Sequence, residues 1–147
     1  MSNEESHSTP SVVPMMAYED GAAAIEWLCE AFGFQERTRM TDDQGRVGHA
    51  ELELGDGVIY LASPTPDYQS PKHHAETCEA ARAWLSVPWV IDGLHVLVDD
   101  VDEHFQRARN AGATILSEPE DEPYGERIYR AADLEGHRWM FGQLIDA

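Results

Sequence analysis

The feature that most constrains the fold is an internal repeat marked by glycines. The stretch from Gly93 to Gln143 reads as a strand, a helix and three further strands, which is a βαβββ order. An upstream stretch has the same order, and placing Gly33 on Gly112 also superposes Gly57 on Gly136. Because glycines mark turns and helix ends, this agreement predicts two copies of one unit. We therefore predict an α+β fold of tandem βαβββ modules that form a cup-shaped mixed sheet with helices outside.

The second copy carries the clearer local signals for a strand followed by a helix. Residues 94–98 alternate as a strand does, and Asp100 stands where an N-cap belongs. Gly112 offers the left-handed conformation that ends a helix. The apolar stripe of the predicted helix consists of Val101, Phe105 and Ala108. We expect this helix to pack its stripe against the sheet.

Three strands are expected after that helix. Residues 113–117 are β-branched and apolar, and we expect Pro119 to end this strand. The Pro-Tyr-Gly at 123–125 predicts a turn into a strand at 126–132, and the last strand is expected at 137–141. The first copy is expected to hold strands at 12–17, 34–40, 47–54 and 58–62, with a helix from Asp20 to Gly33.

These elements divide the chain into four segments. We predict a flexible tail at 1–11, a first module at 12–62, a long connection at 63–92 and a second module at 93–147. The connection is expected to hold a short helix at 75–85. Its Trp84 and Trp89 are interpreted as lid or dimer contacts, with simple packing of the connection as the alternative.

The charge balance excludes some classes of partner. The chain has 28 acidic residues against 10 Lys and Arg, with a formal charge of −18. Such a chain repels nucleic acid and anionic lipid, and it attracts cationic ligands. No run is apolar and long enough for a membrane span. Cys29 and Cys78 are too few for a disulfide framework and suit a cytoplasmic location.

Several motifs in order carry a resemblance to a known family. They are Ala23–Trp27 followed by Ala31–Phe34, His49–Leu52, Val98–Asp102, Ala111–Ala113, Tyr124–Arg127 and Asp133–Trp139. In order and spacing the chain resembles the vicinal oxygen chelate superfamily, within it the glyoxalase and bleomycin resistance branch. The resemblance implies that each module curls into half of a cup that holds a small ligand, and that the protein is a homodimer.

The resemblance also implies where a metal would be held. Metal enzymes of this family place one ligand on the first strand and one on the last strand of each module. By spacing, these positions fall near Val13 and Gly93 and on Leu61 and Met140. None of these side chains suits a hard divalent ion. We therefore expect no cofactor, unless the protein is an enzyme of the family, in which case it would need a divalent metal.

Strand alternation predicts which side chains line the cup. If Leu61 and Met140 point inward, alternate residues on the same and neighbouring strands do so too, while Tyr60, Trp139 and Phe141 pack on the helices. The predicted ligand-binding residues are Met15, His49, Ile59, Leu61, Arg130, Arg138, Met140 and Trp89, with Ile128 as a further wall; Glu51 and His95 are the candidate catalytic residues. This mixture of apolar walls and a few polar groups is typical of a small-molecule site.

The polar members of this set also have plainer interpretations. His95 on a half-buried strand is often a hydrogen-bonded core histidine. Glu51 is expected to pair with Arg130 or Arg138 if it only stabilises the sheet. A third alternative is that His49, Glu51 and His95 form a metal site of two histidines and one carboxylate.

Two functions from different classes remain. The first is metal-free binding of a small, cationic or aromatic compound, in a resistance or sequestration role. The second is a metal-dependent lyase, isomerase or dioxygenase of the glyoxalase type, in which Glu51 or His95 removes a proton next to a carbonyl. The sequence favours binding, because the expected metal positions are apolar.

Overall fold

The computed structural model describes residues 9–87 and 93–145, which form two compact units. The first unit extends to Tyr68, except that the helical turn at 30–32 belongs to the second unit. The first unit contains β1 (Met15–Ala17), most of α2 (Gly21–Phe32), β2 (Gln35–Thr41), β3 (Val47–Leu54) and β4 (Gly57–Ala62). The second contains α3 (Pro71–Thr77), α4 (Glu79–Leu85), β5 (Leu94–Leu97), α5 (Val101–Asn110), β6 (Thr114–Glu122), β7 (Glu126–Ala132) and β8 (Arg138–Leu144).

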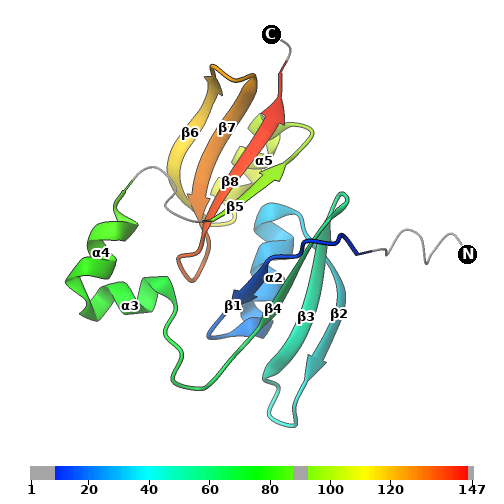
Figure 1. Ribbon diagram of the computed structural model, residues 1–147, viewed down its shortest axis with the longest axis vertical. Coiled ribbons are helices and arrows are strands. Elements are labelled where there is room, and N and C mark those ends of the chain that lie inside the picture. Colours follow the sequence, from blue (N-terminus) through cyan, green and yellow to red (C-terminus); the bar gives the residue numbers. More distant parts are fainter. Residues whose placement is uncertain (1–8, 88–92, 146–147) are drawn as a thin grey trace, which may run out of the picture. The chain divides into compact units, whose positions relative to one another are not determined.

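Each unit is built on a four-stranded mixed sheet, and the two sheets have the same topology (Figure 1). The strand orders are β1-β4-β3-β2 and β5-β8-β7-β6. In both, the first and last strands pair in parallel, and all other pairs are antiparallel. The tandem βαβββ organisation and the α+β class are therefore confirmed. None of the helices in the described part of the chain is long and apolar enough to cross a membrane.

Helix α2 begins and ends at the residues that the sequence indicated. The Asp20 carboxylate accepts a hydrogen bond from the Ala23 N–H at 3.0 Å, and Gly33 ends the helix at a φ of 87°. At its first residue the helix lies very close to β3, because a Cβ on Gly21 would be 2.8 Å from the Val47 Cβ. The absence of a side chain at Gly21 therefore permits this close approach.

In the first sheet, one expectation about side-chain direction is wrong. Ile59 and Leu61 were expected to face the cup, but Leu52 lies opposite Ile59 and Ala50 lies opposite Leu61. Residues directly opposite in antiparallel strands share a face, and all four side chains are buried in the core. Tyr60, expected against the helix, therefore lies on the other face. We call the face of each sheet that points away from its buried apolar side chains the open face.

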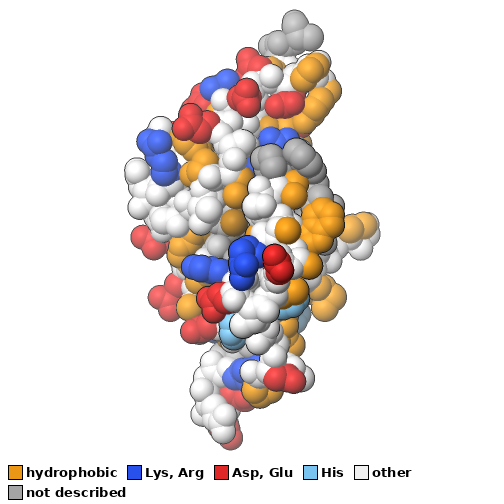
Figure 2. Space-filling view, turned by 90° about the vertical axis from the view of Figure 1, so that its left-hand side faces the viewer, with side chains coloured by type: hydrophobic (Ala, Val, Ile, Leu, Met, Phe, Trp, Pro, Cys, Tyr) orange, Lys and Arg blue, Asp and Glu red, His pale blue; other side chains and the backbone are white. Residues whose placement is uncertain are grey.

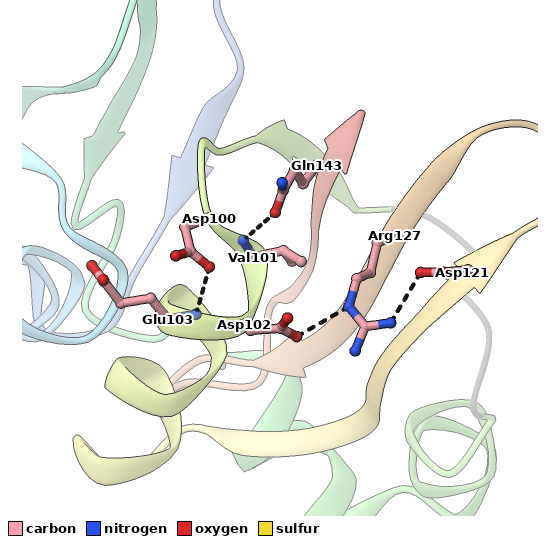
Figure 3. A network of polar contacts seen from close by, with 7 residues as sticks. All are labelled: Asp100, Val101, Asp102, Glu103, Asp121, Arg127 and Gln143. Carbon is pink, nitrogen blue, oxygen red and sulfur yellow. Dashed lines mark hydrogen bonds and ion pairs between the residues drawn. The ribbon is translucent and has the colours of Figure 1, made fainter. Parts of the chain in front are cut away.

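Helix α5 is tied to the last strand at its first turn (Figure 3). Asp100 accepts from the Glu103 N–H at 3.1 Å, which confirms it as the N-cap. The side-chain oxygen of Gln143 on β8 accepts from the Val101 N–H at 2.9 Å. Two of the otherwise unsatisfied amides of the helix start are thus hydrogen-bonded. The chain leaves the helix through Gly112 at a φ of 98°, as predicted.

Arg127 on β7 links α5 to the edge strand β6 (Figure 3). Its guanidinium contacts Asp102 at 3.1 Å and Asp121 at 2.9 Å, and these hydrogen bonds, with Asp121 first, raise the pKa of Arg127. Both carboxylates are well exposed, so these ion pairs contribute at most about 1 kcal/mol each.

The expectation that Pro119 ends a strand is wrong, because β6 continues through it to Glu122. The sheet order places β6 at an edge, where a missing N–H removes no ladder hydrogen bond. The pairing with β7 also shifts between Ser117 and Glu120, so the proline lies within an irregularity of the strand.

The connection contains two short helices, and the single helix predicted at 75–85 is wrong. Ser70 accepts from the His73 N–H at 3.2 Å and so caps α3, which begins at Pro71. Cys78 then adopts an extended conformation, which separates α3 from α4. The sequence pattern missed this break because no glycine or proline marks it.

The turn before β8 is organised by a buried carboxylate. Asp133 is 4% exposed, and its Oδ1 accepts from the N–H groups of Glu135 and His137, both at 3.0 Å. Its Oδ2 accepts from the indole N–H of Trp139 at 3.0 Å. The turn also touches α3, because the Lys72 N–H donates to the Glu135 carbonyl at 2.9 Å. Asp133 therefore holds both the turn and the largest aromatic ring of the second core.

We expect the substitution Asp133→Asn to lower the free energy of unfolding by about 1.5–3 kcal/mol, because an amide directs its nitrogen at one of these donors and loses the charge. Urea unfolding followed by circular dichroism measures the change. Asp42→Asn is the matched control, since the exposed Asp42 also accepts from two backbone N–H groups, at 2.9 and 2.8 Å. Equal losses in the two variants would contradict the special role of Asp133.

Candidate ligand site

The open face of the second sheet carries several of the predicted site residues. His95 on β5 and Arg130 on β7 both lie opposite Met140 on β8, so these three side chains share a face. Trp139 and Phe141, one position away on either side, are fully buried on the opposite face. The facing of all five side chains is as the alternation predicted.

A carboxylate that the sequence analysis did not select lies on this face. Glu126 on β7 is 7% exposed, and its Oε2 atom is 2.7 Å from His95 Nε2. No N–H or O–H of the described residues points at Oε2 with hydrogen-bond geometry, so we regard the contact with His95 as electrostatic. The side chain lies across β8 at Gly142, where a Cβ would be 2.8 Å from Glu126 Cδ. Only a glycine at this position leaves room for the carboxylate.

The two arginines expected in the site have different environments. Arg130 donates from Nη1 to the Ser117 hydroxyl at 3.3 Å, while its buried Nε has no hydrogen-bond partner among the described residues. Arg138 is 8% exposed and donates to the carbonyls of Leu85, at 2.6 Å, and Val87. Arg138 therefore hydrogen-bonds the C-terminal end of α4, whereas the Nε–H of Arg130 has no acceptor among the described residues.

The open face of the first sheet carries a second polar group. Glu51 lies between His49, whose Nε2 is 2.9 Å from Oε2, and Arg37, whose Nε is 3.9 Å from Oε1. The His49 ring meets the Tyr60 ring edge to face at 4.9 Å between centroids. Met15 lies opposite Tyr60 on β1 and is 81% exposed. Imidazole, phenol and thioether side chains thus adjoin one carboxylate.

Within its own unit, Glu51 has an arginine neighbour that the sequence analysis did not select, while its pairing with Arg130 or Arg138 of the other unit stays a prediction. This arginine is Arg37, which lies on the neighbouring strand β2 at a shift in the pairing register. The alternation rule cannot locate a side chain at such an irregularity. Glu126, in contrast, was within reach of the rule, because it alternates with Ile128 and Arg130.

A hollow of about 450 Å³ adjoins this group at the β2–β3 end of the first sheet. It is lined by Met40, Thr41, Asp42, Arg46, Val47, Gly48, His49 and Ser63. Of the predicted site residues only His49 is among them. Trp89, also predicted to touch a ligand, lies outside the described residues, and Trp84 on α4 is 60% exposed.

A histidine on the core side of the second unit was also missed. The His104 Nε2–H donates to the Phe32 carbonyl at 2.7 Å, and the Tyr129 hydroxyl donates to His104 Nδ1 at 2.6 Å. The centroids of the Phe141 and His104 rings are 4.2 Å apart. Burial lowers the pKa of His104 and raises that of Tyr129, so both groups stay neutral at pH 7. His104 is thus part of the packed core and not of the open face.

This architecture can be compared with known proteins. A family model described as Glyoxalase/Bleomycin resistance protein/Dioxygenase superfamily matches residues 12–141. The chain belongs to this superfamily. An uncharacterized protein of Mycobacterium bovis is 33% identical over 136 residues, which are 92% of this chain and 84% of that protein.

Solved structures of other proteins share the fold. TioX from Micromonospora sp. ML1 is 32% identical, with a TM-score of 0.66, and the match covers 94% of this chain and 98% of TioX. TnmS3, an antibiotic binding protein from Streptomyces sp. CB03234, is 19% identical, with a TM-score of 0.59 and coverage of 94% and 99%. The likeness to TnmS3 shows the fold alone.

The strand pairing tests whether the residues suit the metal that enzymes of this superfamily hold. On the open faces, the first and last strands pair Met15 with Tyr60 and His95 with Met140. Within each unit, neither a thioether with a phenol nor an imidazole with a thioether forms a ligand set for a divalent ion, which prefers imidazole and carboxylate groups. The donors at these positions therefore do not fit the metal.

Spacing alone had indicated Val13, Gly93 and Leu61 for three of these positions. Leu61 lies in the core, which corrects that position, whereas Val13 and Gly93 lie just before β1 and β5 and stay predictions. Within the part of the chain that the structure describes, no group of three or more His, Cys, Asp or Glu side chains is placed to hold a metal ion.

One face of the molecule shows how its surface charges are distributed. Figure 2 shows a face on which acidic side chains stand among basic and hydrophobic ones, without a single acidic patch. The net charge of −18 therefore acts as a general field that draws cations toward the protein.

We expect the stability to fall as the pH drops below about 6.5, because the unfolded chain then protonates His104 while the folded state resists it. The contribution is at most about 1.4 kcal/mol per pH unit and ends below the folded pKa. Urea unfolding over a pH series, for the wild type and His104→Gln, measures it. The variant should show a shallower slope, whereas the exposed control His74→Gln should keep the wild-type slope. An unchanged slope in His104→Gln would refute the assignment.

Proposed function

We propose that this protein binds a small aromatic or apolar molecule on the open faces of its sheets without a metal ion, in a resistance or sequestration role. The observation that carries the proposal is the chemistry of the four paired positions. Met15, Tyr60, His95 and Met140 occupy the first and last strands, where metal enzymes of the family hold their ion. Thioether and aromatic groups at those positions contact a ligand directly.

Exposure of apolar side chains supports the same proposal. Met15 is 81% exposed, and Leu97, two residues from His95 on β5, is 54% exposed. Methionine adapts to irregular partners because its side chain is unbranched and polarizable. The polar groups beside them, Glu51 and Glu126, supply the few directed contacts that fix a ligand's orientation.

Relatives and charge support the class of ligand. TnmS3, which has this fold, is an antibiotic binding protein, and the superfamily includes bleomycin resistance proteins. The charge of −18 favours cationic compounds over anionic ones and opposes nucleic acid and anionic membranes as partners.

We also propose that the protein acts in the cytoplasm as a homodimer, with the connection at 63–92 as a lid or subunit contact. Cys29 and Cys78 are both free thiols, which suits a reducing compartment. The exposed Trp84 on α4 is the kind of side chain that covers a ligand or a second subunit.

One observation favours a second function, a lyase or isomerase reaction. The Glu126 carboxylate beside His95 would stabilise the imidazolium that forms when His95 removes a proton next to a carbonyl. The hemithioacetal of methylglyoxal and glutathione is a suitable probe, with solvent deuterium incorporation as the readout. Turnover that is lost in both His95→Gln and Glu51→Gln would favour the enzyme over the binder.

For the binding function, we expect bleomycin or a planar aromatic cation from a ligand panel to raise the melting temperature of the wild type. A ligand at a hundredfold excess over its Kd adds about 2.7 kcal/mol. The substitution Met140→Lys should abolish the shift, because it places a charge in the apolar surface. The control Val12→Lys, at an 81% exposed residue outside the sheets, should keep the shift. No stabilisation by any member of the panel would refute the proposal.

A separate experiment tests whether the protein binds a divalent metal ion. We expect tag-free protein to retain far less than one equivalent of zinc, nickel, manganese or iron(II) after brief dialysis, because its paired positions offer one imidazole and no carboxylate. Elemental analysis measures the ratio. Near-stoichiometric metal that is lost in His95→Gln would overturn the metal-free function and make His95 a ligand.

A further inference from the structure

Among the described residues of the second unit, two side chains hold a buried polar atom without a hydrogen-bond partner: Arg130 at Nε and Glu126 at Oε2. The Glu126 side chain is more than nine-tenths buried, and Oε2 accepts no hydrogen bond from the described residues. Burying an ionised carboxylate without hydrogen bonds costs several kcal/mol, and one electrostatic contact with a partly exposed histidine offsets little of this. In a ligand-binding fold, a buried carboxylate oxygen without a partner is suited to accept a hydrogen bond from a donor group of the ligand.

The strands hold this carboxylate in one place. Glu126 starts β7, and its side chain crosses β8 over Gly142, which leaves space for it. Gly142 pairs with Leu97 on β5, two residues beyond His95. The carboxylate therefore lies near two side chains of β5, the His95 imidazole and the exposed Leu97, on the open face of the sheet.

We propose that Glu126 is the anchor for a protonated amine or an N–H group of the ligand, whose apolar body lies on Leu97 and Met140. This inference rests on the proposed binding function and adds the class of ligand: an organic cation with an aromatic or apolar body. Gly142 is a positioning residue, because it keeps the carboxylate flat on the sheet. His95 borders the anchor and fixes the side from which the donor arrives.

The charges around the anchor favour a cation over an anion. Glu122 lies directly opposite Glu126 on β6, so a second carboxylate adjoins the group. Arg130, two alternate positions along β7, directs one donor to Ser117. Arg130 keeps its positive charge on the same face, so the negative environment of the anchor comes from Glu122 beside it and from the net charge of −18.

The test compares two probes that share one aromatic body, 2-naphthylmethylammonium and the neutral 2-naphthylmethanol. Their affinities are measured by isothermal titration calorimetry for the wild type, Glu126→Gln and Glu118→Gln. We expect the wild type to bind the cation at least about tenfold more tightly than the alcohol, a difference of about 1.4 kcal/mol. Glu126→Gln should reduce this ratio to near one, while affinity for the alcohol stays the same. Glu118→Gln removes the same charge from an exposed residue of the neighbouring strand and should keep the ratio.

A second variant tests position without changing charge. Gly142→Ala places a methyl group where the Glu126 carboxylate lies and should reduce the ratio as Glu126→Gln does. This variant also tests the inference if Glu126→Gln does not fold. A wild-type ratio that persists in Glu126→Gln, or in a folded Gly142→Ala, overturns the anchor.

The outcomes separate this inference from the proposed function. If the amine and the alcohol bind the wild type equally, and Met140→Lys abolishes both, the binding function stands and the anchor is refuted. If neither probe nor bleomycin binds the wild type, both are refuted. Retention of a divalent metal that depends on Glu126 overturns the anchor too, because the carboxylate is then a metal ligand.

Discussion

The second unit depends on the pairing of β8 with a strand on each side, and above all on its two-residue alternation. Trp139 and Phe141 enter the buried core, while Met140 and Gly142 between and after them face the other way. One strand thus supplies the largest aromatic surface of the unit and the floor of the candidate site. Because a slip of one residue would exchange the two faces, stability and ligand contacts are fixed by the same register.

Several residues that carry the family resemblance are structural in this chain. Asp100 caps a helix, Gly33 ends one, and Asp133 holds the turn before β8. They satisfy backbone groups at points where the chain changes direction, which every member of such a fold must do. The paired positions of the first and last strands lie on the open faces instead, away from these caps and turns. Membership of the superfamily therefore fixes the scaffold and leaves the chemistry to those few positions.

The sequence predicted the elements well and the side-chain environments unevenly. In the second sheet, alternation placed His95, Arg130 and Met140 on one face, as observed. In the first sheet it failed at Ile59 and Leu61, because their direction was taken from the spacing of a metal position and not from the strand opposite. Arg37 escaped prediction because a shift in pairing breaks the alternation where it lies.

The repeat, the helix ends and most strand bounds could be predicted from the sequence, since these depend on residues close together in the chain. Tertiary structure decided which charges meet: Glu51 with Arg37, His95 with Glu126, and Arg138 with the end of α4. These contacts depend on which strands are neighbours and on their register, which a local pattern does not contain. The space for Glu126 over Gly142 is a contact of the same kind, because a glycine in a strand reveals its role only when the group that lies over it is known.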